Sequence, residues 1–154
     1  MEFVCCRAII IKDEKLVVME REKNGFCYYA FPGGHVEKGE SNEDCVKREV
    51  LEEFGIIVEP QKLVYVYEFN GQKQAFYLSK WVAGKIHKTD AEEYQPSQKN
   101  GYYNPTIVSF DKLGQINLMP PEITTQLISD YKAFGKNLSP TTVKIKGKIW
   151  KTKN

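Results

Sequence analysis

The stretch GESNEDCVKREVLEEFG, residues 39–55, predicts the best-defined helix in the chain. Ser41 suits the N-cap, because its hydroxyl can accept a hydrogen bond from a free amide of the first turn. Gly55 suits the position after the last turn, where left-handed backbone is common. An apolar stripe at helical spacing consists of Val46, Val50 and Phe54. One flank of this helix is therefore expected to pack against a core.

Three carboxylates, Glu49, Glu52 and Glu53, fall within five positions of the same helix. At 100° per residue they cover an arc of about 100° on adjacent turns, so their charges repel. A solvated acidic helix face would tolerate this, since each pair costs only about 0.2–0.5 kcal/mol. A positive partner would relieve the repulsion. Arg48 is one candidate, and a divalent cation such as Mg²⁺ is the stronger one, because Mg²⁺ binds carboxylates together with substrate phosphates.

The segment before the helix favours the metal interpretation over the solvated face. Gly33 and Gly34 end a short aromatic strand, and the chain then passes through Glu40 into the helix. A glycine turn lets the backbone approach a ligand closely. Glycines, acids and Arg48 together indicate a site for phosphate and metal.

Most of the remaining chain has the patterns of strands. The dipeptide Asn70-Gly71 is the strongest hairpin signal. Residues 84–104 are polar and predict a long loop, and residues 120–135 predict a second helix with proline at its start and glycine at its end. The order of strands, helix, strands and helix predicts an α+β fold. The predicted strand regions are residues 4–11, 15–21, 26–34 with a break at Pro32, 56–84 and 105–113.

Composition narrows the class of protein. The chain has 154 residues, which suits one domain, and residues 1–138 are predicted to form it. No apolar run approaches the roughly 20 residues of a membrane helix, and the N-terminus does not resemble a secretory signal. The four cysteines form no C-x-x-C pair and are expected to be reduced thiols, mostly buried. We therefore expect a cytoplasmic protein with no membrane partner.

Residues 139–154 are predicted to be a basic C-terminal tail. From residue 137 onward the chain has five lysines and no acid, whereas the rest carries a net charge of −3. The alternating TVKIKGKIW segment suits an edge strand or a flexible arm. Such a tail can bind nucleic acid, but a solvated terminal segment is the favoured interpretation.

Residues 34–56 resemble the full signature of the Nudix hydrolases, and the preceding FPGG is typical of that family. This resemblance implies an α/β/α sandwich with a mixed central sheet. It also implies hydrolysis of a phosphoanhydride in a nucleoside diphosphate linked to another group, with Mg²⁺ or Mn²⁺ as cofactor. The positions that match the signature are Gly34, Glu40, Arg48, Glu49, Val50, Glu52, Glu53, Gly55 and Ile56.

The resemblance also assigns expected roles. Glu49, Glu52 and Glu53 match the metal-binding acids, and the carbonyl of Gly33 is a common further ligand. Arg48 would orient a neighbouring glutamate through a charge-assisted hydrogen bond. Glu40 would support the site or bind metal through water. Gly34 would provide the backbone geometry of the site. The general base is either a glutamate of the signature or an acid on a distant loop, for which the candidates here are Glu92 and Glu93.

The favoured substrate is a nucleoside triphosphate or a modified nucleotide. The protein is expected to be a monomer or a homodimer. Three alternatives stay open: an ADP-ribose or dinucleotide pyrophosphatase, an RNA 5′-pyrophosphohydrolase, and a Nudix-fold module that senses a nucleotide without cleaving it. Sensor modules usually lose part of the acidic signature, and this chain keeps all of it.

Overall fold

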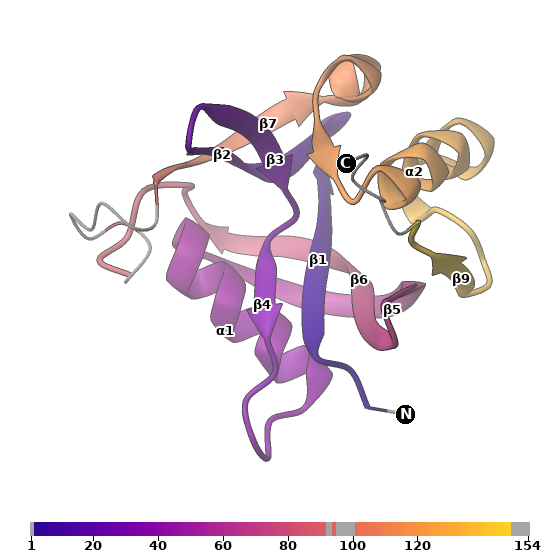
Figure 1. Cartoon of the computed structure of the whole chain (residues 1–154), viewed down its shortest axis with the longest axis horizontal. Coiled ribbons are helices and arrows are strands. Elements are labelled where there is room, and N and C mark those ends of the chain that lie inside the picture. Colours follow the sequence, from indigo (N-terminus) through magenta and orange to yellow (C-terminus); the bar gives the residue numbers. More distant parts are fainter. Residues whose placement is uncertain (1, 92–93, 95–100, 149–154) are drawn as a thin grey trace, which may run out of the picture.

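The computed structural model describes residues 2–91, 94 and 101–148. Within them, two α-helices and two 3-10 helices accompany a mixed nine-stranded sheet (Figure 1). The helices are α1 (Asn42–Phe54), η2 (Phe110–Gln115), α2 (Pro121–Phe134) and η3 (Gly135–Asn137). The strands are β1 (Cys5–Lys12), β2 (Lys15–Lys23), β3 (Phe26–Ala30), β4 (Gly33–His35), β5 (Ile56–Phe69), β6 (Gln72–Gly84), β7 (Tyr102–Ser109), β8 (Leu118–Met119) and β9 (Val143–Lys146).

The sheet is organised around β1. Its strand order is β8-β3-β2-β1-β6-β5-β9, with β4 paired to β1 and β7 paired to β2. The β1–β6, β3–β8 and β5–β9 pairs are parallel, and the other pairs are antiparallel. The sheet is therefore mixed, as predicted.

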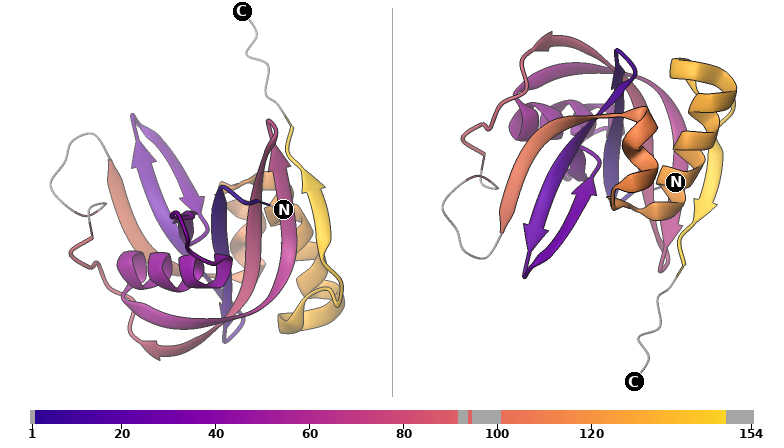
Figure 2. Two further views of the ribbon diagram at one scale, coloured as in Figure 1. Left: turned by 90° about the horizontal axis from the view of Figure 1, so that it is seen from below. Right: turned by 90° about the horizontal axis from the view of Figure 1, so that it is seen from above.

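The two α-helices cover opposite faces of this sheet (Figure 2). Side chains alternate between the faces of a strand, so Ala8 and Ile10 of β1 pack with α1, whereas Ile9 packs with α2. The α1 side of this core contains the predicted stripe of Val46, Val50 and Phe54, all fully buried. The α+β class and the α/β/α sandwich are confirmed.

The local signals located most elements correctly. Asn70 and Gly71 join β5 to β6 with φ angles of 52° and 77°, as a type I′ hairpin turn requires. The aromatic strand ends at Ala30, close to the predicted break at Pro32, but Gly33 and Gly34 begin a further strand that was not predicted. β3 pairs with β2, whereas β4 crosses to β1. β7 begins at Tyr102, three residues before the predicted strand.

The described part of the tail joins the edge of the sheet. β9 lies parallel to residues 65–68 of β5, with Val143 and Ile145 half-buried and Lys144 and Lys146 exposed. The division of the chain at residue 138 stays a prediction. None of the described helices is long and apolar enough to cross a membrane.

Candidate active site

Gly33 occupies a position that only glycine can fill. Its φ is +136°, and a Cβ there would lie 2.2 Å from the carbonyl oxygen of Cys6 on the neighbouring strand. The amide of Gly33 donates to Oε1 of Glu53 at 3.1 Å, and its carbonyl accepts from Nη1 of Arg7 at 3.1 Å. Gly33 thus connects β4 to the last turn of α1 and to β1.

Gly34 allows α1 to approach β4 closely. A Cβ on Gly34 would lie 2.6 Å from the carboxyl carbon of Glu49, so any larger residue would displace that carboxylate. Gly34 also pairs in register with Cys6 of β1, which fixes β4 in the sheet. The two glycines therefore hold Glu49 and Glu53 against the same short strand.

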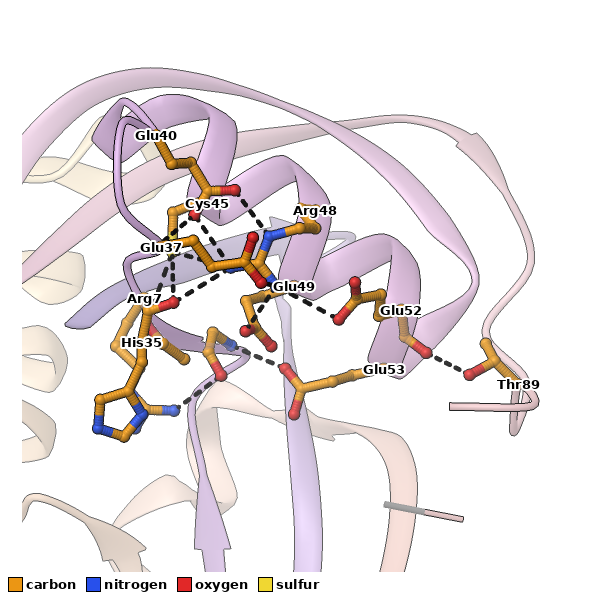
Figure 3. A network of polar contacts seen from close by, with 12 residues as sticks. Arg7, His35, Glu37, Glu40, Cys45, Arg48, Glu49, Glu52, Glu53 and Thr89 are labelled. Carbon is orange, nitrogen blue, oxygen red and sulfur yellow. Dashed lines mark hydrogen bonds and ion pairs between the residues drawn. The ribbon is translucent and has the colours of Figure 1, made fainter. Parts of the chain in front are cut away.

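Arg48 connects the acids of this region (Figure 3). It binds Glu40 with two hydrogen bonds of 2.7 and 3.0 Å, and its Nη1 lies 3.0 Å from Oε1 of Glu49 and 3.4 Å from Oε2 of Glu52. The Arg48 guanidinium lowers the pKa of the Glu40 carboxyl to about 2, and hydrogen bonding to Glu40 raises the pKa of Arg48 further above its ordinary value. Arg48 therefore offsets much of the repulsion expected within the helix.

The three clustered glutamates have different surroundings. Glu53 is buried, and the side chain of Glu49 is 13% exposed, whereas that of Glu52 is 49% exposed. Glu49 and Glu53 line a cleft of about 640 Å³ together with Gly33 and Gly34. Glu52 is not among the lining residues and instead borders a shallower hollow beside Thr89. The cleft thus brings together two of the three predicted acids.

The donor atoms around Gly33 fit a hard divalent cation. Carboxylates of Glu49 and Glu53 and the carbonyl of Gly33 are oxygen ligands, which Mg²⁺ and Mn²⁺ prefer. Among the described residues, no three histidine, cysteine or acidic side chains are already grouped as a metal site. A bound ion would share oxygens that now accept hydrogen bonds from Arg48, Gly33 and Arg7.

The cleft also has an aromatic and cationic part. Arg21 of β2 pairs in register with Tyr28 of β3 and with Tyr103 of β7. Its guanidinium carbon lies 3.8 Å from the ring centre of Tyr103 and 5.4 Å from that of Tyr28. Met119 of β8 lines the same region. No local sequence pattern predicts this group, because its members come from four strands.

The segment after β6 caps the C-terminus of α1. The last carbonyls of a helix lack partners within the helix. Here the Thr89 hydroxyl donates to the carbonyl of Glu52, the Tyr94 hydroxyl donates to that of Glu53 at 2.5 Å, and the His87 amide donates to that of Phe54 at 3.1 Å. The turn that carries Glu52 and Glu53 is therefore fixed by residues from a distant loop.

His87 contacts the end of α1 from the same segment. The ring of His87, for which the sequence indicated no role, covers Gly55 so closely that a Cβ there would lie 2.0 Å from it. Glu92 and Glu93, the loop candidates for the general base, lie outside the described residues.

The site thus consists of β4, a short strand that begins with two glycines, the acidic helix α1 packed on it, and a cleft that residues of both elements line. Residues 4–122 match the family model described as the NUDIX domain, so the chain belongs to the Nudix family. The resemblance carried by residues 34–56 is thereby confirmed. Nudix hydrolases generally use divalent metals.

Similar proteins include hydrolases of different substrates. The chain is 44% identical over 66 residues to an ADP-ribose pyrophosphatase of Methanocaldococcus jannaschii, covering 42% of this chain and only 38% of that protein. It is 35% identical over 85 residues to an 8-oxo-dGTP diphosphatase of Buchnera aphidicola, covering 53% of this chain and 68% of that protein. A solved NUDIX hydrolase from Nitrosomonas europaea superposes with a TM-score of 0.63 and 26% identity, covering 86% of this chain and 90% of that one.

Proposed function

We propose that this protein is a metal-dependent pyrophosphohydrolase that cleaves a phosphoanhydride bond of a nucleotide. The observation that carries the proposal is the mixed lining of the cleft. Glu49, Glu53 and Gly33 line it together with Arg21 and its flanking tyrosines, Tyr28 and Tyr103. A nucleotide has the matching chemistry, with a diphosphate that binds metal and a base that stacks on planar groups.

Each residue of the acidic part of the cleft has a defined role in this proposal. Glu49, Glu53 and the carbonyl of Gly33 hold the cation, and Glu52 contributes to its outer coordination from the edge of the site. Mg²⁺ or Mn²⁺ bound there would neutralise the diphosphate and polarise its phosphoryl oxygens. Arg48 keeps the Glu49 carboxylate oriented, and Glu40 holds Arg48 by its paired hydrogen bonds. Gly34 leaves room for Glu49.

A carboxylate must also accept the proton of the attacking water. Glu92 and Glu93 are the loop candidates, and Thr89 and Tyr94, on either side of them in sequence, bond to carbonyls of α1. Glu92→Gln, Glu93→Gln and the double variant should be compared with wild type for turnover. Near wild-type turnover in all three would assign the base to a glutamate of the helix.

The favoured substrate is a nucleoside triphosphate or a modified nucleotide. The relative from Buchnera aphidicola, named an 8-oxo-dGTP diphosphatase, supports this class. ADP-ribose is the second candidate, because the relative from Methanocaldococcus jannaschii is named an ADP-ribose pyrophosphatase. Both substrates contain a diphosphate, so the metal-binding acids of the cleft suit either one.

A substrate panel tests the proposal. Canonical and oxidised nucleoside triphosphates, ADP-ribose, dinucleoside polyphosphates and capped RNA are incubated with Mg²⁺ or Mn²⁺, and the products are identified by mass. We expect metal-dependent cleavage of at least one nucleotide between two phosphorus atoms. Nucleotide binding by calorimetry without any cleavage would show a sensor module instead.

A matched pair of variants links any such activity to the acids of the cleft. The double variant Glu52→Gln, Glu53→Gln should lose binding of Mn²⁺ in the presence of a non-hydrolysable nucleotide. Asp44→Asn removes one charge from the exposed first turn of α1 and should leave that binding unchanged. Equal metal binding in the double variant and in wild type would contradict the assignment.

A further inference from the structure

Two arginines contact the β4 region, and their charges are compensated differently. Arg48 forms ion pairs with Glu37, Glu40, Glu49 and Glu52. Arg7 instead donates from Nη1 to two neutral carbonyls, those of Phe31 at 3.3 Å and Gly33 at 3.1 Å. The first arginine is neutralised by carboxylates, and the second is bound only through dipoles.

No carboxylate of residues 2–91, 94 and 101–148 forms an ion pair with Arg7. The other group beside it is the thiol of Cys5, and burial raises the pKa of that thiol, which keeps it neutral near pH 7. Arg7 is nevertheless half-buried. A partly desolvated cation that forms no direct ion pair gains free energy when an anion binds to it.

The position of Arg7 indicates which anion that is. Arg7 lines the same cleft as Glu49 and Glu53, and it pairs in register with Gly33. The backbone of Gly33 accepts from Arg7 and donates to Glu53, and both of these side chains are labelled in Figure 3. A diphosphate held by metal at Glu49 and Glu53 would therefore lie next to the Arg7 guanidinium.

The chemistry of the side chain suits this contact. Both carbonyl bonds come from Nη1, so further N–H groups of the guanidinium remain for a ligand. A guanidinium binds phosphate oxygens in a planar, often bidentate, geometry that a lysine cannot reproduce. We propose that Arg7 is a phosphate-binding residue that contacts a non-bridging oxygen of the substrate's diphosphate. This inference rests on the proposed function, because it takes the ligand to be a nucleotide with a diphosphate.

Calorimetry with imidodiphosphate and Mg²⁺ tests this contact without any need for turnover. Wild type should bind imidodiphosphate, and Arg7→Met should bind it about tenfold or more weakly, the usual effect of losing a charge-assisted hydrogen bond. Arg7→Lys keeps the charge and should lose less. Lys12→Met removes one positive charge from the other end of β1, outside the cleft, and should bind like wild type.

Thermal unfolding of each variant separates lost binding from lost folding. If Arg7→Met does not fold, Arg7→Gln decides the question, because its amide can still donate to the carbonyls of Phe31 and Gly33. Unchanged imidodiphosphate binding in the folded variant, or no binding in wild type, would overturn the inference. So would equal losses in Arg7→Met and Lys12→Met.

The two proposals can fail separately. Imidodiphosphate binding that depends on Arg7, with no nucleotide cleaved in the panel, would refute the proposed function and leave the phosphate contact standing. Nucleotide hydrolysis that Arg7→Met does not alter, with unaltered imidodiphosphate binding, would refute the contact and leave the function standing.

Discussion

The amide of Gly33 donates a 3.1 Å hydrogen bond to Oε1 of Glu53, across 20 positions of sequence. This bond joins the start of β4 to the last turn of α1. It places a buried carboxylate at the cleft beside the carbonyl that is expected to bind metal. Gly33 adopts a φ of +136°, and a Cβ there would lie 2.2 Å from the carbonyl oxygen of Cys6, so no other residue fits this position.

Glu53→Gln should separate the catalytic from the structural contribution of this contact. The amide oxygen of glutamine can still accept from Gly33, so we expect the midpoint of thermal unfolding to change little. Turnover should fall by at least about a hundredfold, because even outer-shell partners of a metal cost 10- to 100-fold. Thermal unfolding and product release, measured on the same samples, check this. A destabilised variant with unaltered hydrolysis would show that Glu53 has only a structural role.

Glu40→Gln should lower stability in a pH-dependent way. Arg48 lowers the pKa of Glu40 from an ordinary 4.5 to about 2. Because the folded pKa is the lower one, the stabilisation is present near neutral pH and is lost as the pH falls from about 4.5 toward 2. We expect a loss of about 1–2 kcal/mol at pH 7, since the pair is partly solvated. Urea unfolding at pH 7 and pH 3 measures it. An equal loss at both pH values would contradict the linkage.

Tyr94→Phe should loosen the last turn of α1. The variant keeps the ring, which packs edge-on against Tyr103, and removes the hydroxyl that binds the carbonyl of Glu53. We expect faster amide exchange at Phe54 and Gly55, and a turnover about tenfold lower with little change in KM. Tyr102→Phe makes the same chemical change at an exposed site and is the control. Equal exchange rates in the two variants would exclude an anchoring role for the Tyr94 hydroxyl.

Tyr103→Leu should weaken binding of the nucleoside and leave phosphate binding intact. The Tyr103 ring stacks on Arg21, and both residues line the cleft. Stacking of a base on an aromatic group contributes about 1–3 kcal/mol, so the KM for a nucleotide should rise about tenfold or more. Imidodiphosphate binding, measured by calorimetry with Mg²⁺, should not change. If the nucleotide and imidodiphosphate lose affinity equally, the Tyr103 ring supports the phosphate-binding residues instead.

The sequence alone determined the elements whose signals are local. Ser41 accepts from the amide of Asp44, and Gly55 ends α1 with a φ of 71°, as the capping pattern predicts. The hairpin at Asn70 and Gly71 has the same kind of origin, because asparagine and glycine themselves tolerate positive φ angles. The clustering of Glu49, Glu52 and Glu53 also follows from helical spacing within a few residues.

Only the tertiary structure decided how those acids are used. Sequence spacing treats the three glutamates alike, but packing on β4 buries Glu53 and leaves the Glu52 side chain half-exposed. Sequence reasoning favoured a divalent cation as the partner of these acids. In the structure Arg48 already contacts four carboxylates, because the loop through Glu37 and Glu40 folds back onto α1.

The remainder of the cleft depends on strand register, which no local pattern encodes. Arg7 meets Gly33 because β1 pairs with β4, and Arg21 meets Tyr103 because β2 pairs with β7. A shift of one residue in either pairing would turn these side chains to the opposite face of the sheet. The register is held by the apolar residues buried on both faces of the sheet, so the cationic side of the cleft exists only once the whole core has formed.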